Sequence, residues 1–149
     1  MKTLLAVRPT VALALGLCLA LPAAAATDRR GEGNIAAGRQ AMQSQDYLVA
    51  QLQFERAIVA NPKNTQGYVL LGQVHRRLGN VDKALKYLDL ALDLEPGLLS
   101  ARQLRGEAQL DAGRLGAAEE ELAKLGGKCN FACVEFNDLR KAVLEYKAR

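Results

Sequence analysis

Apolar residues return at steps of three and four along most of the chain, which is the spacing of one face of an α-helix. In the central stretch, residues 65–98, one such run ends at Gly79-Asn80 and a second ends at Pro96-Gly97. Glycine and proline at these points interrupt the helical pattern. The stretch therefore predicts two amphipathic helices joined by a tight turn. Such a pair buries its apolar faces only by stacking on similar pairs.

The same period predicts helices on both sides of the central pair. These helices span residues 35–43, 47–60, 100–110 and 115–125. Asn64-Thr65 supplies a helix cap before the central pair, and Gly126-Gly127 ends the last of the four helices.

The C-terminal segment, residues 127–149, departs from this arrangement but still predicts an amphipathic helix. Its apolar positions are Phe131, Val134, Leu139, Ala142, Val143 and Tyr146. Acidic residues come early and basic residues late, in the order that the helix dipole favours. We expect this helix to cover the apolar face that residues 115–125 would otherwise expose.

Small and large side chains also recur at a constant interval, which we call the repeat interval. It separates Gly38 from Gly72 and Gly72 from Gly106. An alanine column (Ala50, Ala84, Ala118) and a column of large apolar residues (Phe54, Leu88, Leu122) keep the same step. Small residues allow two helices to cross closely, and a large neighbour fills the space that they leave. The interval predicts three helix pairs, at about residues 31–64, 65–98 and 99–132.

With these positions the chain resembles the tetratricopeptide repeat family, whose unit is a 34-residue helix pair. The middle copy carries the family pattern at Tyr68, Leu71, Gly72, His75, Ala84, Leu88, Ala91 and Pro96. The third copy has Arg102 and Arg105 at positions that are usually bulky. The resemblance covers residues 31–126 and implies an all-α fold, an α-solenoid of three helix-turn-helix repeats, here followed by the capping helix.

The resemblance also implies a binding surface, because the first helices of such repeats line a concave face. The inward positions fall on Arg39, Gln43, Gln66, Gln73, Arg76, Ser100, Gln103 and Glu107. Glutamine and arginine there suit hydrogen bonding to an extended peptide or its carboxylate. Ordinary hydrophilic surface is the alternative for each residue. Family members that bind a terminal carboxylate present lysine and asparagine at these positions, and this chain does not.

Residues 1–26 differ in composition from the rest of the chain. Lys2 and Arg8 precede an apolar run, residues 11–21, and small residues follow at positions 23–26. This is the pattern of a cleaved secretory signal peptide. We expect export to a bacterial periplasm, with no membrane span after cleavage. An uncleaved anchor and a lipoprotein through Cys18 are the alternatives. The polar residues 27–33, with two glycines, predict a flexible lead.

Two cysteines remain after the leader, Cys129 and Cys133. An even number in an exported chain favours a disulfide. Side chains four apart on one helix lie too far apart for that bond, so we expect Cys129 in the turn before the helix that carries Cys133. The bond would fasten the capping helix. A thiol-redox pair is the alternative, although the spacing is C-x3-C rather than C-x2-C.

Charge and chemistry narrow the function further. From residue 27 onward, 18 basic and 16 acidic residues give +2, and no basic cluster interleaved with aromatic residues predicts nucleic-acid binding. His75 is the only histidine and is expected to be packed. Glu119, Glu120 and Glu121 are expected to be a surface charge run. No nucleophile-base pair, metal set or phosphate loop is present in the sequence, so we predict no enzyme and no cofactor.

The leading hypothesis is therefore an exported, non-catalytic scaffold that binds a protein or peptide through the concave face. The alternatives are a thiol-redox protein and a self-associating structural subunit.

Overall fold

The computed structural model describes residues 23–129 and 133–149, with side chains from residue 31 onward. Within these ranges the chain forms seven α-helices and no strand. They are α1 (Ala23–Gln43), α2 (Tyr47–Ala60), α3 (Thr65–Arg77), α4 (Val81–Leu94), α5 (Leu99–Asp111), α6 (Leu115–Gly126) and α7 (Val134–Lys147). The all-α prediction is confirmed. Most of the expected signal peptide, and Phe131 of the expected capping helix, lie outside the described residues.

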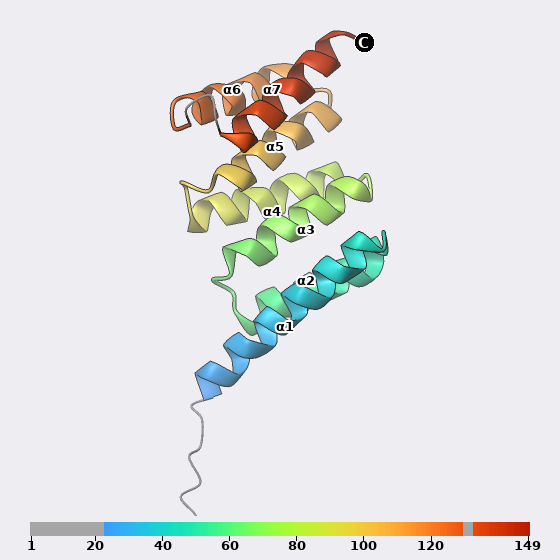
Figure 1. Ribbon diagram of the computed structural model, residues 1–149, viewed down its shortest axis with the longest axis vertical. Helices are drawn as coiled ribbons and strands as arrows, with labels where there is room; N and C mark the ends of the chain where they lie inside the picture. The colour runs from blue at the N-terminus through green and yellow to red at the C-terminus, as the bar shows by residue number, and fades with distance from the viewer. Residues whose placement is uncertain (1–22, 130–132) are drawn as a thin grey trace, which may run out of the picture.

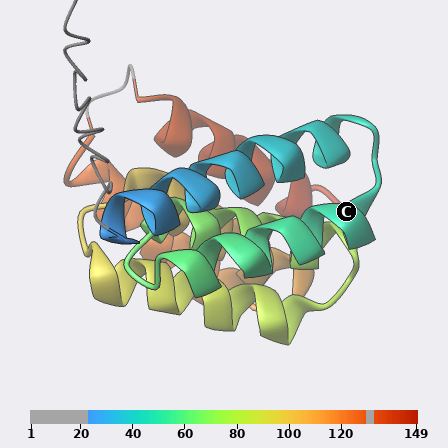
Figure 2. The ribbon, with the colours of Figure 1, turned by 90° about the horizontal axis from the view of Figure 1, so that it is seen from below.

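Consecutive helices pair and the pairs stack, with α1 and α2 at one end and α7 at the other (Figure 1). Seen from the α1 end, the helices lie across the stack rather than along it (Figure 2). Each element packs on its neighbours in the chain, and α5 also contacts α3 and α7. None of the described helices has the length and apolar character that crossing a membrane requires.

The first helix starts earlier than the sequence pattern predicts. α1 begins at Ala23, so residues 27–33 are helical where we expected a flexible lead. Gly31 is buried, and a β-carbon built on it would lie 3.6 Å from the carbonyl oxygen of Ala57. This is an ordinary van der Waals distance, so the start of α1 packs beside the end of α2 without requiring glycine at this position.

The three turns within the helix pairs share one backbone conformation. Gln45, Gly79 and Gly113 have φ of 60°, 73° and 74°, and successive members are one repeat interval apart. In each of these turns, the amide of the next residue donates to the carbonyl five positions earlier, as the amide of Asn80 does to the carbonyl of His75 at 2.8 Å. This is the hydrogen-bond pattern that closes a helix on a left-handed residue. The backbone conformation of the turns therefore also recurs at the repeat interval, although the first turn carries glutamine where the other two carry glycine.

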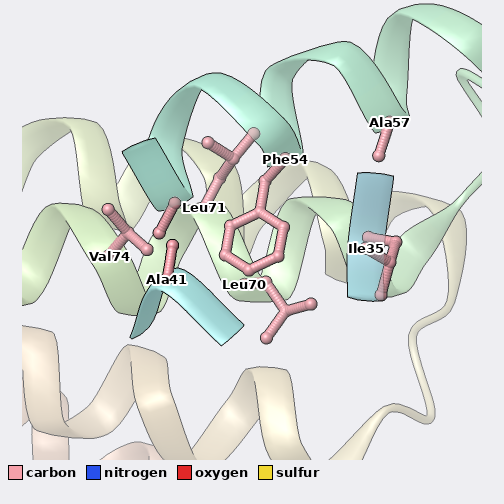
Figure 3. Close-up of a cluster of buried hydrophobic side chains, with 8 residues drawn as sticks. Ile35, Ala41, Phe54, Ala57, Leu70, Leu71 and Val74 are labelled. Atoms are coloured by element: carbon pink, nitrogen blue, oxygen red, sulfur yellow. The ribbon is translucent and has the colours of Figure 1, made fainter. Parts of the chain in front are cut away.

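The glycine column lies where helices cross most closely, as predicted. Gly38, Gly72 and Gly106 are all buried. A β-carbon on Gly72 would lie 2.6 Å from Cγ of Leu88, which is too close. A β-carbon on Gly38 would likewise be too close to the ring of Phe54. Figure 3 shows Phe54 of α2 pointing into the cluster of apolar side chains that joins the first two repeats.

The third repeat breaks the column of large residues. A β-carbon on Gly106 would lie 2.5 Å from Cδ2 of Leu139, which belongs to α7, whereas Leu122 of α6 is only half-buried. The sequence prediction that Leu122 fills this space is therefore wrong. α7 packs against both α5 and α6, so Leu139 enters from the next helix of the stack. The capping role of the last helix is confirmed.

A buried ion cluster links α5 and α6 beside the apolar contacts of these two helices. Glu121 is 4% exposed, and its carboxylate lies 3.1 Å from Arg102, 2.9 Å from Arg105 and 2.9 Å from Lys124. The expectation that Glu121 is a surface charge is wrong, because the two arginines at the usual bulky positions point their guanidinium groups at it. Arg105 also pairs with Asp89 of α4 at 2.7 Å.

Electrostatics keep this glutamate ionised. Burial alone would raise the pKa of Glu121, but hydrogen bonds from Lys124 and the charge of Arg105 outweigh that effect and hold its pKa below the usual 4.5. The third repeat is thus held together by a buried ion cluster in addition to the apolar contacts of Leu110, Ala118 and Leu125.

Candidate functional site

The inner side of the stack contains a hollow of about 450 Å³ between the first helices of the three repeats. Its lining comes from α1, α3, α5 and the turn before α5. The lining residues are Arg39, Thr65, Gln66, Val69, Leu70, Gln73, Leu98, Ser100, Gln103 and Leu104. We call this hollow the groove.

Five residues that the family resemblance placed on the concave face lie together in the groove. Arg39 comes from α1, Gln66 and Gln73 come from α3, and Ser100 and Gln103 come from α5. Three helices far apart in sequence therefore contribute side chains to one surface. The positions on α3 and α5 are one repeat interval apart, as Gln66 and Ser100 show.

The groove combines an apolar floor with polar, mostly uncharged walls. Val69 and Leu70 are each 8% exposed and form part of the floor. Among the described residues, Gln66 and Gln73 donate no side-chain hydrogen bond to the protein, so their amides are available to a ligand. A glutamine amide both donates and accepts, which matches the N–H and C=O groups of an extended backbone.

Two of the predicted residues lie outside the groove, in a second hollow of about 990 Å³. Arg76 and Glu107 line it together with the ends of α3, α5 and α7. Nη1 of Arg76 forms a salt bridge with Glu107, and its Nε donates to Asp111 at 2.8 Å. Gln103 also donates to Glu107, at 2.9 Å. The charge of Arg76 is therefore already met by two carboxylates of the protein.

The last predicted residue, Gln43, is the exposed final residue of α1 and lines neither hollow. Sequence reasoning missed Asp111, although it lies one helical turn after Glu107 on the same face. It also missed the apolar lining of the groove, because Val69 and Leu98 follow the helical period of ordinary core residues.

His75 is packed, as the sequence predicts, and is 1% exposed. Its ring stacks on Tyr87 with centroids 5.3 Å apart. Among the described residues its Nδ1 has no hydrogen-bond partner. Burial lowers the pKa of His75 below its usual 6.5, Lys83 lowers it further, and Glu55 opposes the shift. The neutral, packed imidazole therefore stabilises the second repeat rather than serving as a base.

The two cysteines lie close together beside the capping helix. Their Cα atoms are 5.4 Å apart, which is within the range of bonded cysteines. Cys129 follows α6, and Cys133 is the residue just before α7. The expectation that Cys133 lies within the helix is off by one position, since it caps α7 instead.

Comparison with known proteins agrees with this architecture. Residues 35–98 match the Tetratricopeptide repeat family. A segment of 57 residues is 42% identical to anaphase-promoting complex subunit 3 of Dictyostelium discoideum, covering 34% of this chain and 6% of that protein. The chain thus spans a small part of the curated relative that it matches.

Solved structures of low sequence identity share the fold. The first TPR of Spaghetti (RPAP3), bound to the HSP90 peptide SRMEEVD, superposes with a TM-score of 0.69 at 21% identity, covering 82% of this chain and 96% of that one. A second structure is the type III secretion chaperone SycD of Yersinia enterocolitica in complex with a peptide of the translocator YopD. It superposes with a TM-score of 0.66 at 21% identity, covering 77% of this chain and 87% of that one. Yeast Tom70 superposes with a TM-score of 0.68 at 19% sequence identity, covering 82% of this chain and 25% of Tom70.

Proposed function

This chain belongs to the tetratricopeptide repeat family, and on that premise we propose that it is a non-catalytic interaction module whose groove binds a segment of a protein or peptide partner. The observation that carries the proposal is the convergence of Arg39, Gln66, Gln73, Ser100 and Gln103 on one hollow. Two proteins of the same fold bind peptides, the HSP90 peptide in one and the YopD peptide in the other.

The chemistry of the groove favours a segment that is neutral or weakly charged. Gln66 and Gln73 offer amides that make no side-chain hydrogen bond within the described residues, and Val69 and Leu70 offer an apolar floor. Arg39 is the charged residue that lines the groove itself, whereas Arg76, next to the groove, is already matched by two carboxylates. Backbone hydrogen bonds and one or two apolar side chains would supply the affinity.

The groove is tested by substituting Gln66→Ala and Gln73→Ala together and capturing partners from the native compartment. Both residues lie on the surface of α3, so the fold is expected to persist, and binding of the specific partner is expected to fall at least about tenfold. Lys86→Ala, at an exposed position of α4 that does not line the groove, is the matched control. A partner that binds the double variant as well as the parent would place the interaction on another surface.

We extend the proposal to the compartment: the chain is exported through its N-terminal leader and acts in the cell envelope. The support is the sequence of residues 1–26, with two basic residues, an apolar run and small residues at its end. Intact-mass measurement of the protein from its native host is expected to show an N-terminus at Ala26 or Thr27. A mass that retains the leader would contradict cleavage.

In that compartment we expect Cys129 and Cys133 to form a structural disulfide. Closing a loop of about five residues contributes on the order of 2 kcal/mol in the chain-entropy model. Thiol titration of the unfolded, unreduced protein tests this directly, because a staple leaves neither cysteine reactive. Two titratable thiols would refute the staple, and rapid reduction by a dithiol protein would favour the redox alternative.

A further inference from the structure

Gln103, on the α5 wall of the groove, has an amide that the protein already holds at one end. Its Nε2 donates to Oε1 of Glu107 at 2.9 Å, one helical turn later on the same helix. Among the described residues its Oε1 accepts no hydrogen bond. Gln66 and Gln73 of α3, in contrast, make no side-chain hydrogen bond within the described part of the chain. The three groove amides therefore differ in what they offer a ligand.

Charge determines which end of the Gln103 amide is held. Nη1 of Arg76 forms a salt bridge with Glu107, which is therefore a carboxylate with acceptor atoms only. A carboxylate accepts a hydrogen bond from the NH2 group of an amide and repels its oxygen. Nε2 of Gln103 must therefore face Glu107, because the flipped amide would place two acceptors against each other.

Arg76 of α3 is fixed in turn by a second carboxylate. Its Nε donates to Asp111 at 2.8 Å, one helical turn beyond Glu107 on α5. The side chains of Arg76 and Glu107 are 20% and 19% exposed, which limits competition from water. A continuous chain of hydrogen bonds thus runs from Asp111 through Arg76 and Glu107 to Gln103, and its members support one another.

The other repeats provide an internal comparison for this chain of hydrogen bonds, because equivalent positions recur at the repeat interval. At the positions of Gln103 and Arg76 the other repeats carry apolar side chains. The equivalents are Ile35 and Val69 for Gln103, and Met42 and Leu110 for Arg76. The repeat therefore accommodates apolar residues at both positions, so helix packing alone does not account for the polar pair.

On the premise that the groove binds a peptide segment, as proposed above, we propose that Arg76 and Glu107 are positioning residues that fix Gln103 to accept a backbone N–H of that segment. Gln103 lines the groove, whereas Arg76 and Glu107 line the second hollow. The amide nitrogen is thus held from outside the groove, and Oε1 is the atom that remains for a ligand. The α5 wall then selects a donor, while the amides of α3 either donate or accept.

This arrangement specifies the kind of segment that fits. The segment is extended and has a free N–H opposite α5. Proline at that position has no N–H and would leave Oε1 of Gln103 unpaired. An acidic side chain there is also disfavoured, because its oxygens would meet Oε1 with the charge of Glu107 behind it.

The test starts from a peptide selected for the groove. A library of random linear peptides is selected on the full protein, and peptides that still bind the double variant Gln66→Ala with Gln73→Ala are discarded. Each backbone N–H of a selected peptide is then replaced in turn by an ester oxygen, which removes one donor and keeps the shape. We expect at least one replacement to weaken binding about fivefold or more, because Oε1 of Gln103 then faces an oxygen.

The roles of the residues are measured by the ratio of two dissociation constants at that position, ester peptide over amide peptide. Gln103→Met is expected to bring the ratio to within about twofold of one, because no acceptor remains. Glu107→Gln is expected to lower the ratio too, because the introduced amide no longer excludes the flipped orientation of Gln103. A variant that only loosened α5 would weaken both peptides equally and leave the ratio unchanged.

A matched control comes from the same helix. Gln109 is a glutamine of α5 that does not line the groove. Gln109→Met therefore makes the same chemical change as Gln103→Met and is expected to keep the wild-type ratio.

The free protein gives a second measurement that needs no ligand. Heteronuclear NMR is expected to show slower exchange with water for the side-chain amide of Gln103 than for those of Gln66 and Gln73, because its Nε2 is bonded to Glu107. Glu107→Ala removes the acceptor and is expected to abolish the difference. Equal exchange in the wild type would overturn the positioning of Gln103.

Three binding results would count against different parts of the proposal. A library without any peptide that depends on Gln66 and Gln73 would overturn peptide binding in the groove itself. A groove-dependent peptide whose ester ratio is the same in Gln103→Met would overturn the role of Gln103 alone. A ratio that falls in Gln103→Met and not in Glu107→Gln would overturn the positioning role of Glu107.

Discussion

Gln45 holds a backbone conformation that glycine holds in the two later turns. Its φ of 60° lies in the left-handed region, which disfavours residues with a β-carbon. The turn persists because the amide of Asp46 still donates to the carbonyl of Ala41 at 2.9 Å. The hydrogen-bond geometry, rather than the side chain, therefore determines the conformation of this residue.

We predict that Gln45→Gly stabilises the protein by about 0.5–1 kcal/mol, because relief of the left-handed strain exceeds the greater entropy of glycine in the unfolded chain. Urea unfolding gives the free energy. Gln40→Gly, within exposed helix, should instead destabilise by about 1 kcal/mol. A loss of stability in Gln45→Gly would show that the glutamine side chain makes a favourable contribution to this turn.

His75 should make stability depend on pH near neutrality. Its folded-state pKa lies below the unfolded value of 6.5, so the unfolded chain binds more protons between the two values. Stability is therefore fully present above 6.5 and falls as pH drops from 6.5 towards the lowered pKa, by at most about 1.4 kcal/mol per pH unit.

We predict that His75→Phe removes this slope, since phenylalanine retains the stacking on Tyr87 but does not titrate. Unfolding free energies at about pH 5.5 and about pH 7.5 are the measurement. The pKa of Glu121 is held below 4.5, so its contribution is lost only at lower pH. Equal slopes in the two proteins would assign the effect to other groups.

At the scale of elements, one buried carboxylate links α5 and α6 in addition to their apolar contacts. Glu121 meets Arg102 and Arg105, whose side chains are 12% and 21% exposed. Removing the acid would leave Arg105 with Asp89 as its remaining carboxylate, and Arg102 with only the Pro96 carbonyl, while Nε of Arg102 already has no partner among the described residues. Breaking such a pair costs much more than the pair contributes over an apolar alternative.

We expect Glu121→Gln to destabilise the protein by about 2–3 kcal/mol, with the partial exposure of the arginines reducing the cost from that of a fully buried pair. Glu120→Gln, the exposed neighbour, should change stability by less than about 0.5 kcal/mol. Chemical denaturation of both variants provides the comparison. Similar values for the two would mean that Glu121 is solvated.

The capping helix α7 contributes a core side chain to the third repeat. Leu139 is fully buried against Gly106, while Leu122 is half-buried. We predict that Leu139→Ala costs about 2–5 kcal/mol, because it leaves a cavity, and that Leu122→Ala costs less. Thermal unfolding of the two variants discriminates between the packing in the structure and the packing that the repeat interval alone suggests. The reverse order would place Leu122 at the crossing.

At the scale of the whole molecule, stability should follow position in the stack. α3 and α4 have neighbours on both sides, whereas α1 and α2 lie at one end and α7 at the other (Figure 1). In a stack of repeats each unit is stabilised by its neighbours, so the ends open first. We predict that amide hydrogen exchange is slowest in α3 and α4. Uniform protection measured by mass spectrometry would indicate all-or-none opening of the whole stack.

The sequence by itself determined the helices, their turns and the constant interval between equivalent positions. These features depend on local backbone preferences and on small residues at helix crossings, which recur in each repeat and so are visible without distant contacts. The bounds of α2, residues 47–60, and the burial of Gly38, Gly72 and Gly106 follow from these local features. Five groove residues were placed through the family resemblance, which assigns inward positions of the first helices to the concave face.

Only the tertiary structure decided which distant side chain fills each space. Leu139 displaces Leu122 at Gly106, Glu121 is buried between two arginines, and Arg76 pairs with Glu107. None of these contacts is local: Leu139 comes from a helix outside the three repeats, Glu107 lies two helices after Arg76, and Glu121 lies on the helix after its arginines. Helical period assigns a side chain to a face of its own helix, whereas burial and pairing depend on what the rest of the chain places against that face.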